Sequence, residues 1–157
     1  MIVGTGISNW PGYNKIRFCG EQARRDDLQY FWVDTCCIDK SSSTELQEAI
    51  NSMFRWYCKS AMRLKCYVYL VDVSLSAGGK PSQPPWESSF RKSRWFTRGW
   101  TLQELVAPLL VELFSKAGER LSDKRSLERY IHEITGIPVK TFQGSPLSNF
   151  SVPERIL

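Results

Sequence analysis

The sequence predicts an α/β fold in which a doubly wound parallel sheet carries helices on both faces. Stretches rich in β-compatible residues lie at 29–37, 66–73 and 109–114. Stretches with helical periodicity precede, separate and follow them. Because strands that alternate with helices form parallel sheets, this order predicts the doubly wound class. Ligands of that class bind beyond the carboxyl ends of the strands.

Length and composition favour one domain. The chain has 157 residues, 42% of them hydrophobic, so we expect a single domain over 1–157 with its own core. Within it, residues 1–12 are predicted to be an atypical N-terminal segment and 140–157 an irregular tail. No apolar run approaches the roughly 20 residues of a membrane span, and signal-peptide features are missing. These features predict a cytoplasmic location, no membrane span and reduced thiols.

The charge balance bears on the partner. A net charge of +5 predicts weak attraction to anions. The cations are spread along the chain without an aromatic-basic signature, so a nucleotide-sized ligand fits better than a specific nucleic acid. A solvated basic surface with no partner is the alternative.

Periodicity predicts the helices. Tyr13 to Leu28 is amphipathic but contains Gly20, and Ser42 with Glu45 forms a capping box that begins a helix reaching Lys59. The apolar stripe of that helix is expected to pack in the core and consists of Leu46, Ala49, Ile50, Met53, Phe54 and Tyr57. A third helix is predicted at 126–135, where Gly136 and Pro138 mark its end.

Composition predicts the strands. Gln29 to Cys37 carries a single charge, Asp34, and reads as a buried central strand. Further strands are predicted at 66–73 and 109–114, and Met1–Val3 offers at most a brief strand. The loops after the first two long strands, 38–43 and 74–98, should therefore emerge on the same side of the sheet.

The segment 93–108 gathers the residues most suited to chemistry. Leu102, Leu105 and Val106 form one apolar helical face, and Pro108 limits the helix. Glu104 is the only acid in the segment. Four cations precede it and would draw an anionic ligand towards the carboxylate: Arg91, Lys92, Arg94 and Arg98.

Each candidate also has a structural interpretation. Thr101 and Glu104 have capping-box spacing, which would use the carboxylate structurally. Trp95 and Trp100 suit either core anchoring or stacking on a ligand ring. Asp34 and Asp72 lie near strand ends, where hydrogen bonding to loop backbone is the simpler interpretation.

Metal binding and the usual nucleotide motifs are not indicated. The five cysteines include no Cys-x-x-Cys pair, and His132 is the only histidine, so we predict no metal site. The adjacent Cys36 and Cys37 are expected to be buried thiols, and His132 a helix-surface residue. No glycine-rich dinucleotide or nucleoside-triphosphate motif occurs.

Three long motifs resemble one family. Residues 32–40, 45–57 and above all 95–105 closely resemble the fungal heterokaryon-incompatibility (HET) domain, in the family's order. The resemblance implies a domain of fungal non-self recognition that triggers regulated cell death in innate immunity. It also implies a relation to Toll/interleukin-1 receptor (TIR) domains, many of which hydrolyse NAD, and hence a TIR-like (flavodoxin-like) fold. Met1 to Ile7 departs from the family, because the usual Leu-Ser-x-x-Trp-like first strand is missing or atypical.

The resemblance assigns roles to particular residues. Residues 100–105 look like the Trp-Cys-Leu-x-Glu-Leu pattern of plant TIR domains, which makes Glu104 the catalytic candidate. NAD would be a substrate, with no cofactor. The predicted ligand-binding residues are Asp39 and Lys40 in the loop after the first long strand, Arg94, Arg98 and Lys40 at the pyrophosphate, and Trp95 or Trp100 on a ring.

Whether the domain is an enzyme stays open at this point. A NAD glycohydrolase that forms a homo-oligomer on activation is one reading of the sequence. A non-catalytic, self-associating signalling module is the rival, and a truncated, inactive HET fragment is a third.

Overall fold

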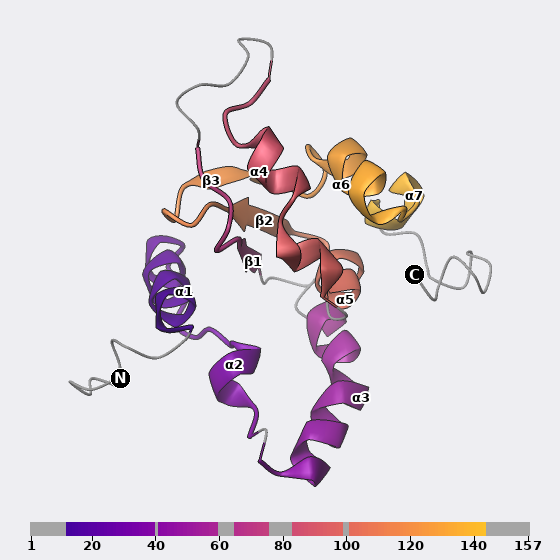
Figure 1. The fold of residues 1–157 in the computed structure, drawn as a ribbon. Coiled ribbons are helices and arrows are strands. Elements are labelled where there is room, and N and C mark those ends of the chain that lie inside the picture. The colour runs from indigo at the N-terminus through magenta and orange to yellow at the C-terminus, as the bar shows by residue number, and fades with distance from the viewer. Residues whose placement is uncertain (1–11, 40, 60–64, 76–82, 99–100, 144–157) are drawn as a thin grey trace. The chain divides into compact units, whose positions relative to one another are not determined.

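The computed structural model describes residues 12–39, 41–59, 65–75, 83–98 and 101–143 (Figure 1). They fall into two compact units, 1–51 and 52–157, each described by itself. The short strand predicted at Met1–Val3 lies outside the described residues, as does the tail from residue 144 onward.

Unit 1–51 begins with helix α1, Tyr13–Arg25, as its periodicity predicts. The helix ends before Leu28 because Asp27 adopts a positive φ of 54°. The Leu28 N–H donates to the Ala23 carbonyl at 2.8 Å and the Asp27 N–H to the Arg24 carbonyl at 3.2 Å. This pair of hydrogen bonds is a Schellman motif, which satisfies the last carbonyls of the helix.

The strand predicted at 29–37 is wrong. Residues 30–33 form no strand, and Asp34–Cys37 form one helical turn, α2. Val33 and Ile38 on either side of the turn are buried, whereas Tyr30, Phe31 and Trp32 are exposed. The β-compatible composition of 29–37 suggested that the whole segment is buried, but Val33 is its only residue that the structure describes as buried.

Helix α3, Ser43–Lys59, starts where the capping residues predict. The Glu45 N–H donates to the Ser42 hydroxyl at 3.3 Å, but the Glu45 carboxylate accepts from the Asp39 N–H at 2.9 Å. Of the two hydrogen bonds of a capping box, the one to the Ser42 hydroxyl is therefore present. The Glu45 carboxylate instead binds the main chain of the preceding loop at Asp39. Ala49 and Met53 of the predicted stripe are buried.

Unit 52–157 contains a three-stranded mixed sheet in the order β1-β2-β3. β1, Cys66–Tyr69, pairs in parallel with β2, Val111–Phe114, and β2 pairs antiparallel with β3, Arg120–Asp123. The α/β class is confirmed, but the sheet of the described residues is not the doubly wound parallel sheet that was predicted. The TIR-like arrangement is therefore not confirmed.

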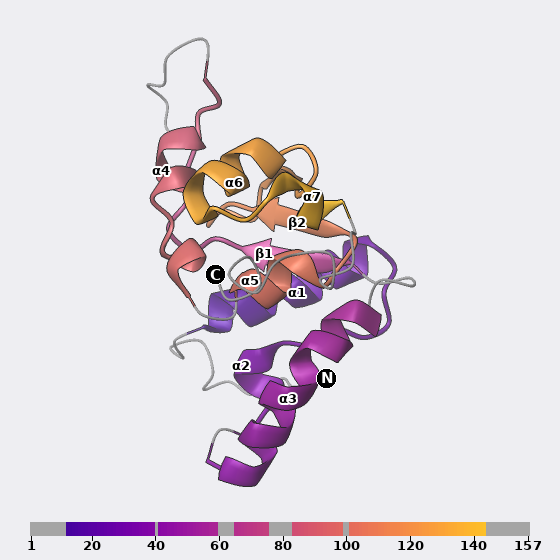
Figure 2. The ribbon, with the colours of Figure 1, turned by 90° about the vertical axis from the view of Figure 1, so that its right-hand side faces the viewer.

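Short helices build the core of this unit. They are α4 (Glu87–Arg91), the 3₁₀ helix η2 (Arg94–Thr97), α5 (Thr101–Val106), α6 (Glu128–Thr135) and α7 (Val139–Phe142). Both views show α6 and α7 next to each other (Figure 2). Gly136 ends α6 with a φ of 74°, as its position predicts, whereas α7 lies where an irregular tail was expected to begin.

One face of the sheet supplies the centre of that core. Val68 of β1 and Leu70, which directly follows the strand, lie in the same cluster as Val111 and Leu113 of β2, since side chains two apart share a face. The helices and the residues next to them add buried side chains to this cluster: Phe90, Trp95, Leu105, Leu127, Ile131, Ile137 and Phe142. The segment 93–108 is thereby fixed at both ends, by Trp95 and by Leu105.

Candidate functional site

Asp72, just beyond β1, holds the start of η2. Its carboxylate accepts from the Ser93 hydroxyl at 2.7 Å and from the Arg94 N–H at 2.9 Å. The Ser93 hydroxyl in turn accepts from the Trp95 N–H at 3.3 Å. Asp72 therefore bonds to loop backbone, which confirms the structural interpretation of this residue.

These contacts keep Asp72 ionised. Burial acts to raise the pKa of Asp72, but the hydrogen bonds from the Arg94 N–H and the Ser93 hydroxyl outweigh it and lower the pKa below its ordinary value. The Arg94 guanidinium, with Nε 3.7 Å from the carboxylate, adds a smaller contribution. The ionised Asp72 carboxylate therefore lies beside the exposed Arg94 at the start of the segment 93–108.

Trp95 connects η2 to the catalytic candidate. Its indole Nε1–H donates to Glu104 Oε2 at 2.8 Å, across nine residues of sequence. The ring is 9% exposed and packs edge-to-face against Phe96. Glu104 itself is half-buried. The burial of the ring favours the anchoring interpretation of Trp95, and the Trp95–Glu104 hydrogen bond fixes the carboxylate on α5.

The capping-box interpretation of Glu104 does not fit the helix start. α5 begins at Thr101, which makes Thr101 the first helical residue and Glu104 the fourth, whereas a capping box joins the residue before the helix to the third. The Thr101 hydroxyl donates to the Trp95 carbonyl instead. The indole and the main-chain carbonyl of Trp95 therefore both form hydrogen bonds with residues of α5.

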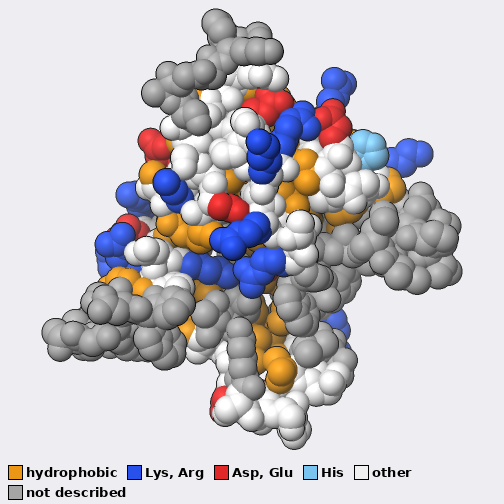
Figure 3. All heavy atoms as spheres, viewed as in Figure 1, with side chains coloured by type: hydrophobic (Ala, Val, Ile, Leu, Met, Phe, Trp, Pro, Cys, Tyr) orange, Lys and Arg blue, Asp and Glu red, His pale blue; other side chains and the backbone are white. Residues whose placement is uncertain are grey.

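Two of the predicted cations lie in the same segment and reach solvent. The Arg94 side chain is 84% exposed, and Arg98 is also exposed. Arg98 makes no side-chain hydrogen bond or ion pair to any residue that the structure describes. Figure 3 shows basic side chains on the face that carries α4 and η2. An exposed ion pair such as Arg94–Asp72 contributes little stability, so an anion can compete for this guanidinium.

Lys124 supports the other end of α5. The side chain is buried, with 2% of its surface exposed, and Nζ donates to the carbonyls of Leu105 at 3.0 Å and Pro108 at 2.6 Å. Burial lowers the pKa of Lys124 to about 8. A buried ammonium thus occupies carbonyls at the end of the helix that carries Glu104, which is where a cation is most favourable.

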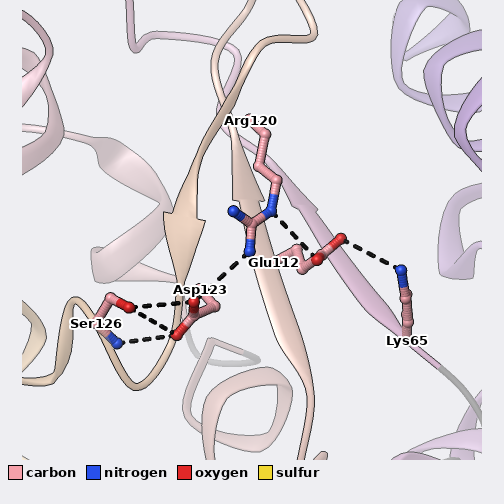
Figure 4. A network of polar contacts seen from close by, with 5 residues as sticks. All are labelled: Lys65, Glu112, Arg120, Asp123 and Ser126. Carbon is pink, nitrogen blue, oxygen red and sulfur yellow. Dashed lines mark hydrogen bonds and ion pairs between the residues drawn. The ribbon is translucent and has the colours of Figure 1, made fainter.

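A polar network holds β3, the strand that ends directly before Lys124 (Figure 4). Arg120 on β3 contacts Glu112 on β2 at 3.2 Å and Asp123 at 3.6 Å, and Lys65 lies 4.0 Å from the same glutamate. Asp123 also accepts from the Ser126 N–H at 2.9 Å. The network holds β3 against β2 and so sets the position of the buried lysine.

The remaining predicted residues lie in unit 1–51 or outside the described residues. Asp39 lies in unit 1–51, where its carboxylate accepts from the N–H of Ser41 at 2.9 Å and from the Ser41 hydroxyl at 2.6 Å. These bonds, led by that from the Ser41 hydroxyl, lower the pKa of Asp39. Lys40 and Trp100 lie outside the described residues. Of the predicted residues, the structure brings Trp95 and Glu104 into contact, and the exposed Arg94 and Arg98 flank Trp95 in the chain.

The expectation of buried cysteines is partly wrong. Cys19 is buried, but Cys36 and Cys37 are exposed and Cys66 is intermediate. His132 is exposed on α6 as predicted, with Nδ1 2.8 Å from the Ile137 carbonyl. Among the described residues no group of three or more His, Cys, Asp or Glu side chains is arranged to hold a metal.

The sequence did not indicate Ser93 or Lys124 as part of the site. Ser93 matters because Asp72, 21 residues earlier, lies beside it. Lys124 sits in a polar stretch, and nothing in its neighbours signals burial. In both cases the partner is distant in sequence, so local patterns carry no information about it.

Comparison with known proteins defines the class. The family model described as heterokaryon incompatibility protein (HET) matches residues 13–69. Residues 13–69 therefore belong to a HET domain. It is also similar to vegetative incompatibility protein HET-E-1 of Podospora anserina, with 62% identity over 145 residues. That alignment covers 92% of this chain and 10% of the relative, so the chain spans about a tenth of the relative's length.

The comparisons do not indicate what chemistry the segment 93–108 performs. The family match ends at Tyr69, before this segment begins. No solved structure matches the chain. None of the helices formed by the described residues is long and apolar enough to cross a membrane.

Proposed function

We propose that this domain acts in fungal heterokaryon incompatibility, as a module of non-self recognition, by cleaving the nicotinamide–ribose bond of NAD. The name of the relative supports the first part. The second part rests on one observation: the Glu104 carboxylate accepts a hydrogen bond at 2.8 Å from the indole of the buried Trp95, which the exposed Arg94 and Arg98 flank in the chain.

The reaction needs a positioned carboxylate more than it needs an acid pair. Cleavage passes through an oxocarbenium-like state, which a carboxylate close to the sugar stabilises or traps. Nicotinamide leaves from a cationic pyridinium and requires no protonation. Glu104 can therefore serve without a second acid, and the indole donor restricts the carboxylate to one orientation, which lowers the cost of positioning it.

The cations would bind the pyrophosphate. Guanidinium groups form charge-assisted, often bidentate hydrogen bonds to phosphate oxygens. Arg94 and Arg98 flank the buried Trp95 in the chain, and both side chains are exposed. Asp39 and Lys40 remain proposed ligand-binding residues, in line with the resemblance. Trp100 remains the proposed stacking residue.

Nicotinamide release from NAD by the concentrated, purified chain tests the proposal. Glu104→Gln keeps an oxygen that can accept the indole hydrogen bond but removes the charge, so release should fall by about 100-fold or more. Glu119→Gln, at an exposed position, is the matched control and should retain the parent rate. Release that persists in Glu104→Gln, or no release from a folded parent chain, would reject Glu104 as the catalytic residue.

The role of Trp95 is tested separately. Trp95→Phe keeps most of the aromatic packing but lacks the indole donor. We expect kcat to fall about tenfold, since a misaligned carboxylate loses roughly 1.4 kcal/mol of transition-state stabilisation, while KM changes less. A variant that changes KM alone would instead indicate that Trp95 contacts the substrate.

Self-association is the second candidate function. The observation that favours it is the consecutive pair Leu109 and Leu110, which are 51% and 58% exposed just before β2. Exposed apolar side chains of this size are common at contacts between protein molecules. The expected result is a mass that rises with concentration in the parent and in Glu104→Gln, but not in Leu110→Asp. A monomer at all concentrations would exclude this candidate for the isolated chain.

A further inference from the structure

Two adjacent thiols lie exposed on α2. Cys36 and Cys37 are both exposed, and their sulfur atoms are 3.8 Å apart. The main chain of Val33 contacts both: Cys36 Sγ lies 3.7 Å from the Val33 carbonyl oxygen, and the Val33 N–H points to Cys37 Sγ at 3.5 Å. Helical backbone bonds from the N–H groups of both cysteines to the same carbonyl complete the turn. The two sulfurs are therefore presented together, by one short turn, to the solvent.

The backbone of α2 sets the cost of joining them. Consecutive Cα atoms are about 3.8 Å apart across a trans peptide, whereas disulfides usually join Cα atoms about 4.4–6.8 Å apart. The sulfurs must also approach from 3.8 Å to about 2.05 Å. A bond between them is thus possible but strained, and strained disulfides are the ones that reform thiols readily.

We propose that Cys36 and Cys37 form a modification site that hydrogen peroxide oxidises reversibly to a vicinal disulfide. One thiol attacks the peroxide, whose O–O bond breaks, and becomes a sulfenic acid with release of water. The neighbouring thiol then attacks that sulfur. The S–S bond forms, the S–O bond breaks, and the hydroxyl group leaves as a second water with the proton of the attacking thiol. Two electrons pass from the thiols to the peroxide.

Oxidation at this site changes the loop that follows. The turn of α2 relies on the Cys37 N–H bond to the Val33 carbonyl at 2.9 Å, which ring closure strains. Asp39 lies two residues beyond Cys37, and its N–H donates to Glu45 at the start of α3. Strain in α2 therefore changes the conformation of the loop after it. This effect depends neither on Glu104 nor on NAD cleavage.

Peptide mass measurement tests the site directly. Trypsin cleaves after Arg25 and after Lys40, and the peptide 26–40 contains no cysteines other than this pair. After treatment with hydrogen peroxide, this peptide should lose two hydrogen atoms in the unreduced digest and regain them with reduced glutathione. Cys36→Ser and Cys37→Ser should give only a sulfenic acid, trapped by dimedone, and Cys66→Ser should behave as the parent chain.

Two further measurements separate the site from accidental oxidation. The disulfide should be about tenfold easier to reduce in the folded chain than in the isolated peptide 26–40, because only the folded chain opposes the ring. Amide exchange should speed up at 34–41 on oxidation and stay unchanged at 111–114. The proposal is overturned if the peptide never loses two hydrogens, if Cys36 or Cys37 bonds to another chain instead, or if oxidation leaves exchange at 34–41 unaltered.

Discussion

The buried Lys124 gives this domain a stability that rises with pH in the alkaline range. Burial lowers the pKa of Lys124 from 10.5 to about 8 in the folded chain, so the unfolded chain binds the proton more tightly. Between these two values the unfolded state carries more protons, and the free energy of unfolding therefore increases with pH. Each pKa unit corresponds to about 1.4 kcal/mol, so the total gain is about 3 kcal/mol.

Lys124→Met isolates this effect, because methionine fills a similar volume and does not titrate. We would measure urea unfolding by tryptophan fluorescence for parent and variant at pH values from about 7 to 11 and extrapolate to water. The parent should gain about 3 kcal/mol relative to the variant between pH 8 and 10.5. Other groups titrate equally in both chains and cancel. A difference that stays constant, or that shrinks with rising pH, would refute the assignment of Lys124 as a destabilised buried cation.

Three further changes should alter stability in predictable directions. Asp72→Asn should cost about 1–2 kcal/mol at neutral pH by urea unfolding, and because the folded pKa of Asp72 is lowered, this cost should fade as the pH drops below about 4. Asp27→Gly should raise the unfolding free energy by about 1 kcal/mol, since Asp27 occupies a φ of 54° that glycine adopts without strain. Gly136→Ala should lower the melting temperature, at a cost of about 1 kcal/mol, because the φ of 74° is strained for alanine although its Cβ would meet no atom. Circular dichroism melts check the last two, and unchanged melting temperatures would contradict them.

The helices could be predicted because their signals are local. The capping serine of α3 and the glycine after α6 specify helix ends within a few residues of themselves. Gly20 within α1 lies next to the Phe31 ring, and a Cβ at this position would make an ordinary contact with the ring at 3.5 Å. The spacing of apolar residues predicted the helix, whereas nothing local predicted that Phe31 packs against it.

The strands could not be predicted as well, because pairing depends on distant segments. β3 has the polar sequence Arg-Leu-Ser-Asp, and it forms because the turn at 115–119 returns the chain alongside β2. Its Arg120 then pairs with Glu112 across the ladder. In contrast, the apolar stretch 29–33 pairs with no strand among the described residues, although its composition is more typical of a strand. The composition of a segment shows whether its side chains favour a strand, but it does not show whether another strand is available to pair with it.

In the candidate site, too, local features could be predicted and contacts between separate elements could not. This difference determines how the role of Glu104 should be tested. The sequence placed Glu104 on a short helix after a cationic turn, but the hydrogen bond from Trp95 depends on how η2 and α5 pack. That bond serves a structural carboxylate as well as a catalytic one. Glu104→Gln preserves an acceptor for the indole and removes the charge, so a purely structural role predicts nearly unchanged stability and function. A chain that keeps its unfolding free energy and its Trp95 indole N–H resonance, but loses nicotinamide release, uses the charge of Glu104 for chemistry; a chain that keeps all three uses Glu104 only to hold Trp95 in the core.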